Sequence, residues 1–435
     1  MKSNRDFIRI GSASLVIKAI ATALAFIAAI VLARELGVDG FGIYTFVYAL
    51  ATVVSIPLQS GLPMLVLRET AKCRQTLNWP LLLGLWRWST KLVSLLTALA
   101  AVVALGLLWS FSERLTTVEY GTYLYAVALI PLIALGNLRG AALRGLGNVL
   151  TGQLPDNILR PALLIGLLLI APYVLHGDLD ASNAMMLHVV AAGGAFLVGG
   201  ALLWRSRPIE LRNVDTAENN PKAWLRSVVP LAMITGVALI NSQIDILMLG
   251  WLLGNTDVAL YRIAMSTSSL VGFGMQAVTS VIAPSFAQLY AAGKLAEIQR
   301  LLRMTAYAAF ALAIPVVLVI FLFGGELIGW AFGTEFAAAS VPLAILAIAV
   351  LINSIIGSVE ALLKMTGFEH DLFYAAVAAL LLKALINLPL ITFHGVSGAA
   401  VGSAISMIIF AISLRILARR RLGVTSGLHL PFKKG

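Results

Sequence analysis

Five basic side chains and one carboxylate lie inside long apolar runs of this 435-residue chain. The bases are Lys18, Lys91, Arg160, Arg262 and Lys383, and the carboxylate is Asp245. An ionised group inside a membrane costs several kcal/mol and usually faces a cavity or a partner. The excess of bases therefore predicts a positively charged site that binds an anion. A phosphate group suits such a site, because arginine offers a forked set of donors and lysine a compact charge.

Two of these bases have a carboxylate within reach. Asp156 and Arg160 are four residues apart, so they can pair on one face of a helix. Asp245 and Arg262 flank a tight turn and lie within about three residues of the same depth, which is close to 4.5 Å along a helix. They form either a structural ion pair or a moving gate. Asn241 lies one turn before Asp245, so we interpret this face as polar and lining a cavity.

The remaining bases differ in depth. Lys18 and Lys91 lie close enough to a helix end for their ammonium groups to snorkel to the membrane edge. Lys383 lies near the middle of its run, and its nearest polar neighbour is Asn387, one turn away. Because Lys383 is too deep to snorkel, we expect it to face a cavity.

Signatures of enzymes are absent from the sequence. The chain has no GxxxxGK[ST] phosphate loop and no HExxH metal motif, and its five histidines are scattered. The single cysteine, Cys73, can form no internal disulfide and matches no metal-ligand spacing. We therefore expect no enzymatic activity, no metal and no cofactor.

The composition is that of a membrane protein. Apolar residues make up 60% of the chain and charged residues 12%, against about a quarter charged in globular proteins. A helix needs about 20 apolar residues to cross the bilayer, and twelve runs are long enough or nearly so. The first six are 11–33, 40–62, 82–110, 120–142, 158–173 and 184–204. The second six are 228–250, 258–286, 304–323, 338–362, 372–393 and 398–417. Their continuous apolar character favours helices over a barrel.

Charges outside these runs orient the chain. Basic residues gather before the first run, in every even-numbered connection and after the last run, whereas the odd-numbered connections are mainly acidic. The positive-inside rule then predicts that both termini are cytoplasmic. This distribution also explains most of the formal charge of +11, so we expect no nucleic-acid partner.

The two halves of the chain echo each other. Leu36 and Gly37 are followed by Tyr44, and Leu253 and Gly254 by Tyr261, at an offset of 253 − 36 = 217 residues. Further echoes near that offset pair Asn137 with Asn353, Arg144 with Lys364, Gly147 with Gly367, and Arg160 with Lys383. Internal duplication in a membrane chain is typical of transporters built from two related halves.

These observations together predict an all-α polytopic membrane protein of about 12 transmembrane helices. Six spans per half give both halves the same orientation, so they should form two six-helix parallel repeats around a central cavity. We expect an N-terminal six-helix bundle at 1–204, a cytoplasmic linker at 205–226 and a C-terminal six-helix bundle at 227–435. The linker is polar and of mixed charge, which is typical of a plain connection.

Two segments at corresponding places resemble a known family. The run LARELGVDGFGIYTFVYALATVVSIPLQSGLPMLVLRETAK resembles the N-terminal signature of bacterial polysaccharide exporters, through Ala33-Arg34, Leu36-Gly37, Gly40, Phe41-Gly42, Tyr44, Gly61 and Leu67-Arg68-Glu69. The run DILMLGWLLGNTDVALYRIA resembles their corresponding second-half segment, through Asp245, Gly250, Gly254, Val258 and Tyr261. These exporters include O-antigen flippases and belong to the multidrug/oligosaccharidyl-lipid/polysaccharide superfamily.

The resemblance implies a flippase that moves a polyprenyl-diphosphate-linked oligosaccharide by alternating access. The implied cargo is the O-antigen of lipopolysaccharide or another surface polysaccharide unit, and the implied location is the bacterial inner membrane. Cationic cavity residues would meet the diphosphate, a role that we assign to Lys18, Arg262 and Lys383. Asp245 and Asn241 are the candidates for gating or coupling. The implied partners are the lipid-linked oligosaccharide, a coupling ion (proton or sodium) and polysaccharide assembly proteins.

Three other classes of protein stay open. A drug/cation antiporter of the same superfamily would use deep carboxylates, and only Asp245 qualifies. A two-half solute transporter of another fold would be favoured by a charged motif between the second and third spans, but residues 67–72 match none. A membrane glycan polymerase or ligase would need a sizeable outer loop with polar catalytic residues, and the predicted outer connections are short.

Overall fold

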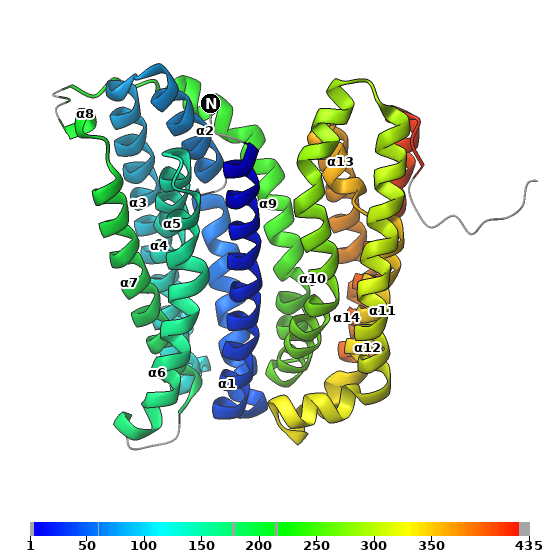
Figure 1. The fold of residues 1–435 in the computed structure, drawn as a ribbon. Helices are drawn as coiled ribbons and strands as arrows, with labels where there is room; N and C mark the ends of the chain where they lie inside the picture. The colour runs from blue at the N-terminus through cyan, green and yellow to red at the C-terminus, as the bar shows by residue number, and fades with distance from the viewer. Residues whose placement is uncertain (1–3, 60, 176–178, 213, 215, 426–435) are drawn as a thin grey trace, which may run out of the picture. The chain divides into compact units, whose positions relative to one another are not determined.

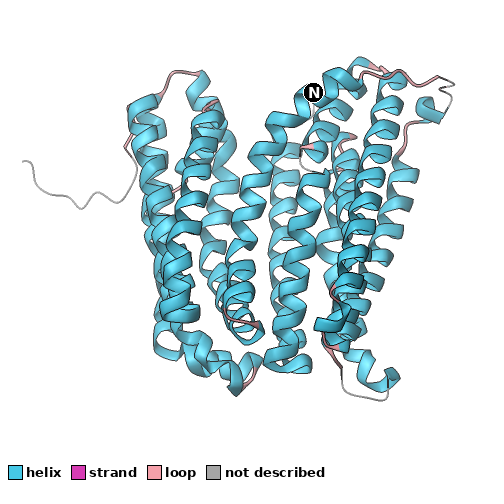
Figure 2. Cartoon of the chain, turned by 180° about the vertical axis from the view of Figure 1, so that it is seen from behind, coloured by secondary structure: helices cyan, strands magenta, loops and turns pink. Residues whose placement is uncertain are grey.

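The computed structural model of the chain describes residues 4–425 except 60, 176–178, 213 and 215. Within these residues every regular element is a helix, and short loops join the helices (Figure 2). The predicted basic positions 2, 433 and 434 lie outside the described residues. An all-helical fold is expected of a chain that crosses a bilayer repeatedly, because a helix satisfies its own backbone polar groups.

The first half of the chain forms eight α-helices and two short elements (Figure 1). They are α1 (Asn4–Gln59), α2 (Leu62–Thr76), α3 (Trp79–Ser110), η1 (Ser112–Arg114), α4 (Thr117–Gly145), α5 (Val149–Leu154), η2 (Pro155–Leu159), α6 (Arg160–Leu175), α7 (Ala181–Ser206) and α8 (Ile209–Arg212). The second half comprises α9 (Pro221–Leu252), α10 (Asn255–Ala291), α11 (Leu295–Phe332), η3 (Thr334–Ala339), α12 (Ser340–Ile356), α13 (Val359–Met365) and α14 (Glu369–Leu422).

Two of these helices are each a pair of spans joined at a glycine. Gly37 in α1 has φ 63° and ψ −175°, and Gly395 in α14 has φ 61° and ψ −140°. Glycine adopts such conformations without the steric cost that a side chain would add. Ten described segments are long and apolar enough to cross a membrane, and counting α1 and α14 twice gives 10 + 2 = 12. The predicted all-α polytopic fold and its count of about twelve spans are confirmed.

The fifth span is longer than its apolar run predicts. It extends from Val149 to Val174 and contains α5, η2 and α6. The middle element, η2, is a π-helical segment in which the N–H of Arg160 bonds to the carbonyl of Pro155. Because the helix continues through this segment, Asp156 belongs to the span. π-Helical segments are rare and often mark functional sites.

The contacts inside each half repeat. Tyr44 Oη lies 2.6 Å from His188 Nδ1, and Tyr261 Oη lies 3.1 Å from Ser403 Oγ, at sequence separations of 144 and 142 residues. Asn137 Nδ2 lies 3.0 Å from Gln59 Oε1, and Asn353 Nδ2 lies 3.9 Å from Met275 Sδ, both at a separation of 78 residues. The same pairs of helices are therefore joined at the same places in both halves, as expected of duplicated six-span repeats.

The outward faces of the spans are apolar. On α3, Leu95, Leu99 and Val102 follow one another at helical spacing and are 68%, 61% and 67% exposed. Exposed apolar stripes of this kind are unfavourable in water and favourable against lipid tails. The described chain is therefore a multi-pass membrane protein.

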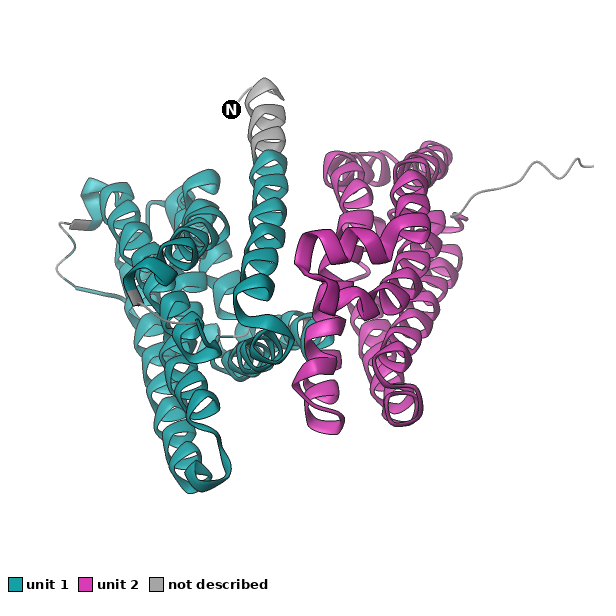
Figure 3. Cartoon of the chain, turned by 90° about the horizontal axis from the view of Figure 1, so that it is seen from below, with its two compact units in different colours: residues 1–243 teal, residues 244–435 magenta. Residues whose placement is uncertain are grey.

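By its packing the chain divides into two compact units, Met1–Gln243 and Ile244–Gly435 (Figure 3). Helix α9 crosses this division, and its residues up to Gln243 belong to the first unit. The predicted boundaries at 204 and 227 count spans instead of contacts, so they stay a prediction, as does the central cavity.

The connection at 205–226 is more ordered than a plain linker. Leu211 and Trp224 are buried in one core cluster with α2, α3 and α4 residues. The backbone N–H of Glu218 donates to the carbonyl of Pro80 at 3.1 Å. A side chain at Gly84 would place its Cβ 1.8 Å from the Glu218 carbonyl oxygen. The connection is therefore docked on α3, which the polar composition alone does not indicate.

Cys73 belongs to the same core cluster. Burial raises the pKa of its thiol above the ordinary value, and the negative charge of Glu69 adds to the shift. Because the thiolate is the reactive form, this cysteine is suited to packing.

Candidate functional site

The most buried charges of the second unit form one ion pair. Asp245 on α9 and Lys383 on α14 lie 2.6 Å apart, Oδ2 to Nζ, and their side chains are 4% and 8% exposed. Burying two charges is costly unless their remaining donors and acceptors are satisfied. The surroundings of the carboxylate meet that condition.

Two neutral side chains complete the shell of Asp245. Tyr261 donates its hydroxyl to Oδ2 at 2.9 Å, and Asn387 donates its amide to Oδ1 at 2.7 Å. Tyr261 also contacts Ser403 on the second segment of α14. Helices α9, α10 and the first segment of α14 therefore meet at one carboxylate, and Tyr261 connects it to the second segment of α14. A change in the charge of Asp245 would act on all of them.

Tight packing surrounds Asn387, one of the two neutral residues that donate to Asp245. Asn387 is fully buried, and its Oδ1 has no hydrogen-bond partner. A Cβ at Gly402 would lie 1.8 Å from that oxygen. Glycine at 402 therefore lets the two segments of α14 approach closely, which fixes the amide that donates to Asp245.

The sequence-predicted residues have different places in the structure. Asp245 and Lys383 come together, whereas Lys18 on α1 and Asn241 on α9 are exposed and belong to the first unit. Arg262 on α10 is partly buried. The depth count predicted Arg262 as the ion partner of Asp245, and the structure gives Asp245 the ion partner Lys383.

Tyr261 and Ser403 were not predicted as site residues. One signal for Tyr261 was available, because it is the residue that echoes Tyr44 across the two halves. Ser403 lies beyond the Gly395 kink, and no local pattern connects it with Asp245.

The first unit holds a second ion pair, whose arginine is buried and whose aspartate is 25% exposed. Arg139 on α4 contacts Asp156 in the π-helical segment, with Nη2 3.2 Å from Oδ2. Its Nη1 donates to the carbonyl of Phe196 at 2.5 Å, and its guanidinium lies 5.1 Å from the centre of the Phe196 ring. The predicted pairing of Asp156 with Arg160 is wrong. The pairing prediction assumed α-helical spacing, whereas these residues lie at a π-helical turn.

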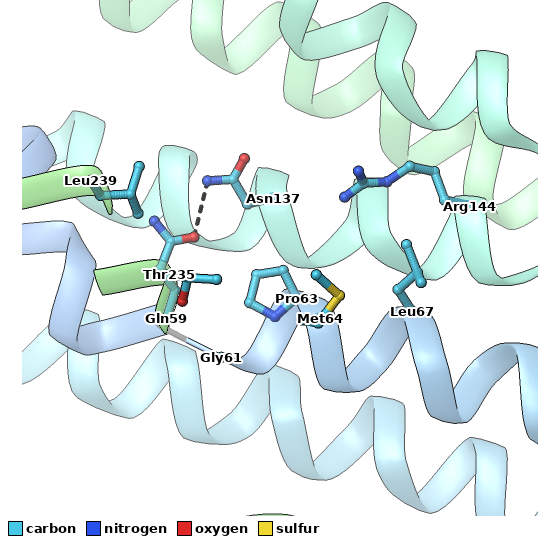
Figure 4. Close-up of a pocket in the computed structure, with 9 residues that line it drawn as sticks. All are labelled: Gln59, Gly61, Pro63, Met64, Leu67, Asn137, Arg144, Thr235 and Leu239. Atoms are coloured by element: carbon cyan, nitrogen blue, oxygen red, sulfur yellow. Dashed lines mark hydrogen bonds between the residues drawn. The ribbon is translucent and has the colours of Figure 1, made fainter. Parts of the chain in front are cut away.

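A cavity of about 240 Å³ lies in the first unit where α1 ends and α2 begins (Figure 4). Its lining comes from α1, α2, α4, α9 and the turn before α2, and consists of Gln59, Gly61, Pro63, Met64, Leu67, Asn137, Arg144, Thr235 and Leu239. Arg144 extends its guanidinium toward the cavity, and Asn137 and Gln59 are hydrogen-bonded at its edge. This cavity combines one cation with several neutral polar groups and an apolar wall.

Metal ligands do not gather in the described part of the chain. No group of three or more His, Cys, Asp or Glu side chains there lies close enough to hold a metal ion.

Comparison with solved structures identifies the fold. An inward-facing multidrug resistance MATE transporter of the MOP superfamily is similar with a TM-score of 0.78 and 16% identity, over 93% of this chain and 94% of that one. The lipid II flippase MurJ, in an inward closed conformation, is similar with a TM-score of 0.66 and 14% identity, over 93% of this chain and 87% of that one. At these identities the likeness establishes the fold.

Sequence comparison adds the family. The probable low-salt glycan biosynthesis flippase Agl15 of Haloferax volcanii is 26% identical over 398 residues, which cover 88% of this chain and 77% of that protein. The MatE family model matches residues 230–388. The model of a family described as polysaccharide biosynthesis protein matches residues 9–290, more than half of the chain. The chain therefore belongs to the polysaccharide biosynthesis protein family.

Proposed function

We propose that this protein is a flippase that moves a polyprenyl-diphosphate-linked oligosaccharide across the cytoplasmic membrane by alternating access. The observation that supports this function most strongly is the family match together with the likeness to a glycan biosynthesis flippase over 88% of the chain. The lipid II flippase fold adds support. The protein moves its substrate without making or breaking covalent bonds, so it is a transporter and not an enzyme.

The substrate is anionic, and the proposed contacts are cationic. Lys18 and Arg262 are assigned to the diphosphate because each lies in a membrane-spanning helix and keeps part of its surface exposed. Lys383 is assigned to the same group, but it is paired with Asp245 in this structure. Lys383 would therefore exchange Asp245 for a phosphate oxygen during transport.

Asp245 is the proposed gating or coupling residue. Its carboxylate receives an ammonium and two neutral donors from other helices. A proton or a sodium ion at Asp245 would compete with Lys383 and loosen the contact between α9 and α14. Asn241 lies one turn earlier on α9 and is exposed, which suits a role in the approach of that ion.

The proposed location is the bacterial inner membrane, with both termini in the cytoplasm. Twelve spans bring both termini to the same side, and the basic even-numbered connections favour the cytoplasm. Proposed cargoes are the O-antigen unit of lipopolysaccharide or another surface polysaccharide. Polysaccharide assembly proteins are the proposed partners at either end of the transport step.

A drug/cation antiporter is the second candidate function. The MatE family match at 230–388 and the MATE fold favour it. Asp245 and Asp156, two carboxylates inside the described spans, are neutralised by Lys383 and Arg139, whereas a drug cation needs a free carboxylate. The glycan flippase is therefore preferred.

A flipping assay on purified protein separates the two functions. Vesicles containing the protein and a fluorescent polyprenyl-diphosphate oligosaccharide are treated with a membrane-impermeant quencher. We expect the quenched fraction to rise above that of protein-free vesicles. Equal quenching in both preparations, together with proton- or sodium-driven uptake of a cationic dye, would contradict the flippase and support the antiporter.

A further inference from the structure

The cavity at the start of α2 is lined by a cation that takes no part in the Asp245–Lys383 ion pair of the second unit. Arg144 on α4 lines this cavity, and none of the ion pairs formed by the described residues includes it. A guanidinium in a membrane-spanning helix normally has an anionic partner. The carboxylate that acts on Arg144 electrostatically, Asp156, is ion-paired with Arg139, so the terminal nitrogens of Arg144 are left to bind an anionic ligand.

Arg144 is held in one orientation by its surroundings. Its Nε donates to the carbonyl of Gly140 at 3.2 Å. Its stem lies against Gly152, where a Cβ would be 2.8 Å from the Arg144 Cγ. Since Nε is occupied, the two terminal nitrogens are the donors that face the cavity (Figure 4). Two parallel N–H donors suit two oxygens of one phosphoryl group.

Neutral polar groups lie beside the guanidinium. Asn137 donates one amide hydrogen to Gln59, which leaves its second amide hydrogen for a ligand. Thr235 donates its hydroxyl to the carbonyl of Leu231, so its oxygen can accept a bond. The site can thus bind oxygens of both kinds, charged and hydroxyl.

The opposite wall of the cavity is apolar. Pro63, Met64 and Leu67 come from α2, and Leu239 comes from α9. A free inorganic anion gains nothing from contact with an apolar wall. A phosphoryl group on a prenyl chain would contact the guanidinium through its oxygens and the apolar wall through its chain. At about 240 Å³ the cavity is smaller than the roughly 300–1,000 Å³ of sites for drug-sized ligands. It therefore suits a headgroup and adjoining chain atoms, and it is too small for a whole oligosaccharide.

The second repeat has the same positions without this chemistry. Lys364, the counterpart of Arg144, is paired with Glu360 at 2.5 Å. Gln59 corresponds to Met275, at an offset of 275 − 59 = 216, and Asn137 to Asn353, at 353 − 137 = 216. Duplication alone would give both halves the same pocket. Among the described residues, a cation outside any ion pair and this amide pair occur together in the first repeat and not at the corresponding positions of the second.

We propose that this cavity binds the phosphoryl headgroup of a polyprenyl-phosphate lipid, with Arg144 as its forked ligand. Asn137 contributes a further donor, and the α2 and α9 side chains contact the chain. The identity of the lipid rests on the proposed flippase function. The site is distinct from Lys18, Arg262 and Lys383, and it adds a second headgroup contact, after Lys18, in the first unit.

Binding of defined probes to the purified protein tests this site. Farnesyl diphosphate should raise the unfolding temperature of the wild-type protein, and farnesol at the same concentration should not. Arg144→Gln should weaken farnesyl diphosphate binding at least tenfold. Arg144→Lys should fall between the two proteins, because it keeps the charge and loses the fork. Lys364→Gln is the matched control, since it removes the counterpart cation that Glu360 already neutralises, and it should bind like the wild type.

Three results would overturn the site. They are wild-type affinity in Arg144→Gln, equal protection by farnesol, and inorganic pyrophosphate binding as tightly as farnesyl diphosphate, which would indicate a free-anion site. Unfolding temperatures without ligand show whether the glutamine variant folds, and the lysine variant tests the site if it does not. Flipping by wild-type protein is scored separately. Normal flipping with unchanged Arg144→Gln binding rejects only this site, and binding without flipping rejects only the proposed function.

Discussion

At the scale of single residues, the buried pair of Asp245 and Lys383 is the most demanding feature of the molecule. Removing one member leaves the other charge buried without a counterion, which costs about 3–5 kcal/mol. Asp245→Asn and Lys383→Met should therefore each lower the unfolding temperature of the purified protein markedly. The double variant should lose less than the sum of the two, because it leaves no buried charge.

An exposed pair provides the control for that prediction. Lys364 and Glu360 are each about half exposed, and such pairs contribute about 0–1 kcal/mol. Lys364→Met should change the unfolding temperature little. If Lys383→Met were equally harmless, the ion pair would not be buried as described. If the double variant is stable but does not flip, the pair has a role in transport beyond stability.

The sequence identified these two residues but not their pairing. Asp245 and Lys383 were found because each is charged within an apolar run. Their contact joins helices 138 residues apart (383 − 245), and no local spacing encodes it. Counting depth from the turn favoured Arg262, whereas Tyr261, its neighbour, donates a hydrogen bond to the carboxylate.

At the scale of elements, the π-helical segment decides which base Asp156 meets. In the structure Asp156 pairs with Arg139, whose guanidinium also fits against Gly199. Arg139→Gln should therefore destabilise the protein strongly, and Arg160→Gln should do so weakly. Thermal unfolding of Arg139→Gln and Arg160→Gln checks this, and each variant is measured with and without the additional substitution Asp156→Asn. Coupling of Asp156 with Arg160 instead of Arg139 would mean that the segment is a regular α-helix.

The break between α1 and α2 depends on one glycine. Gly61 has φ 77°, and a Cβ there would lie 2.5 Å from the Val228 carbonyl oxygen and 2.7 Å from the Ala232 nitrogen. A side chain at such φ costs about 1–3 kcal/mol by itself, and backbone atoms cannot move aside cheaply. Gly61→Ala should reduce both stability and membrane expression.

The matched control is Gly166→Ala in α6, where nothing lies within 4 Å of an added Cβ. In a helix interior alanine is favoured over glycine, so this variant should be neutral or slightly stabilised. Similar losses in both variants would show that the close packing of Gly61 against α9 is not what limits substitution there.

The spans themselves were predictable because a continuous apolar run in lipid has few alternatives to a helix. The docking of the connection at 205–226 on α3 was not predictable from the sequence. Its burial depends on two large side chains, Leu211 and Trp224, scattered among polar residues. Their partners on α2, α3 and α4 are set by the fold of the whole unit.

At the scale of the whole molecule, duplication explains why the helices of the two halves are joined alike, whereas divergence between the halves explains why their charged residues differ. The tyrosine contacts of both halves correspond. The buried carboxylate has no counterpart in the first half, because Ala28 lies 217 positions before Asp245. The cation-lined cavity lies in the first unit and the buried pair in the second. The echoes in the sequence located the framework, but they could not show which copy kept which function.

The orientation of the chain is a separate prediction for the whole molecule. Reporter fusions after Gly254 and Gly395 should report the outer side, and a fusion after Lys294 should report the cytoplasm, because the basic connections stay inside. Activities of alkaline phosphatase and of green fluorescent protein fused at each position check this. An outer-side signal at Lys294 would overturn the topology.

The central claim is that the protein flips a lipid-linked glycan, and deletion of its gene in the native host tests it most directly. Polyprenyl-diphosphate oligosaccharide is then extracted, and its exposure to an impermeant glycosidase is compared in sealed vesicles of known orientation. We predict that the glycan accumulates on the cytoplasmic face, and that wild-type protein, but not Asp245→Asn, restores its transfer. Unchanged exposure of the glycan on the outer face in the deletion strain would contradict the account.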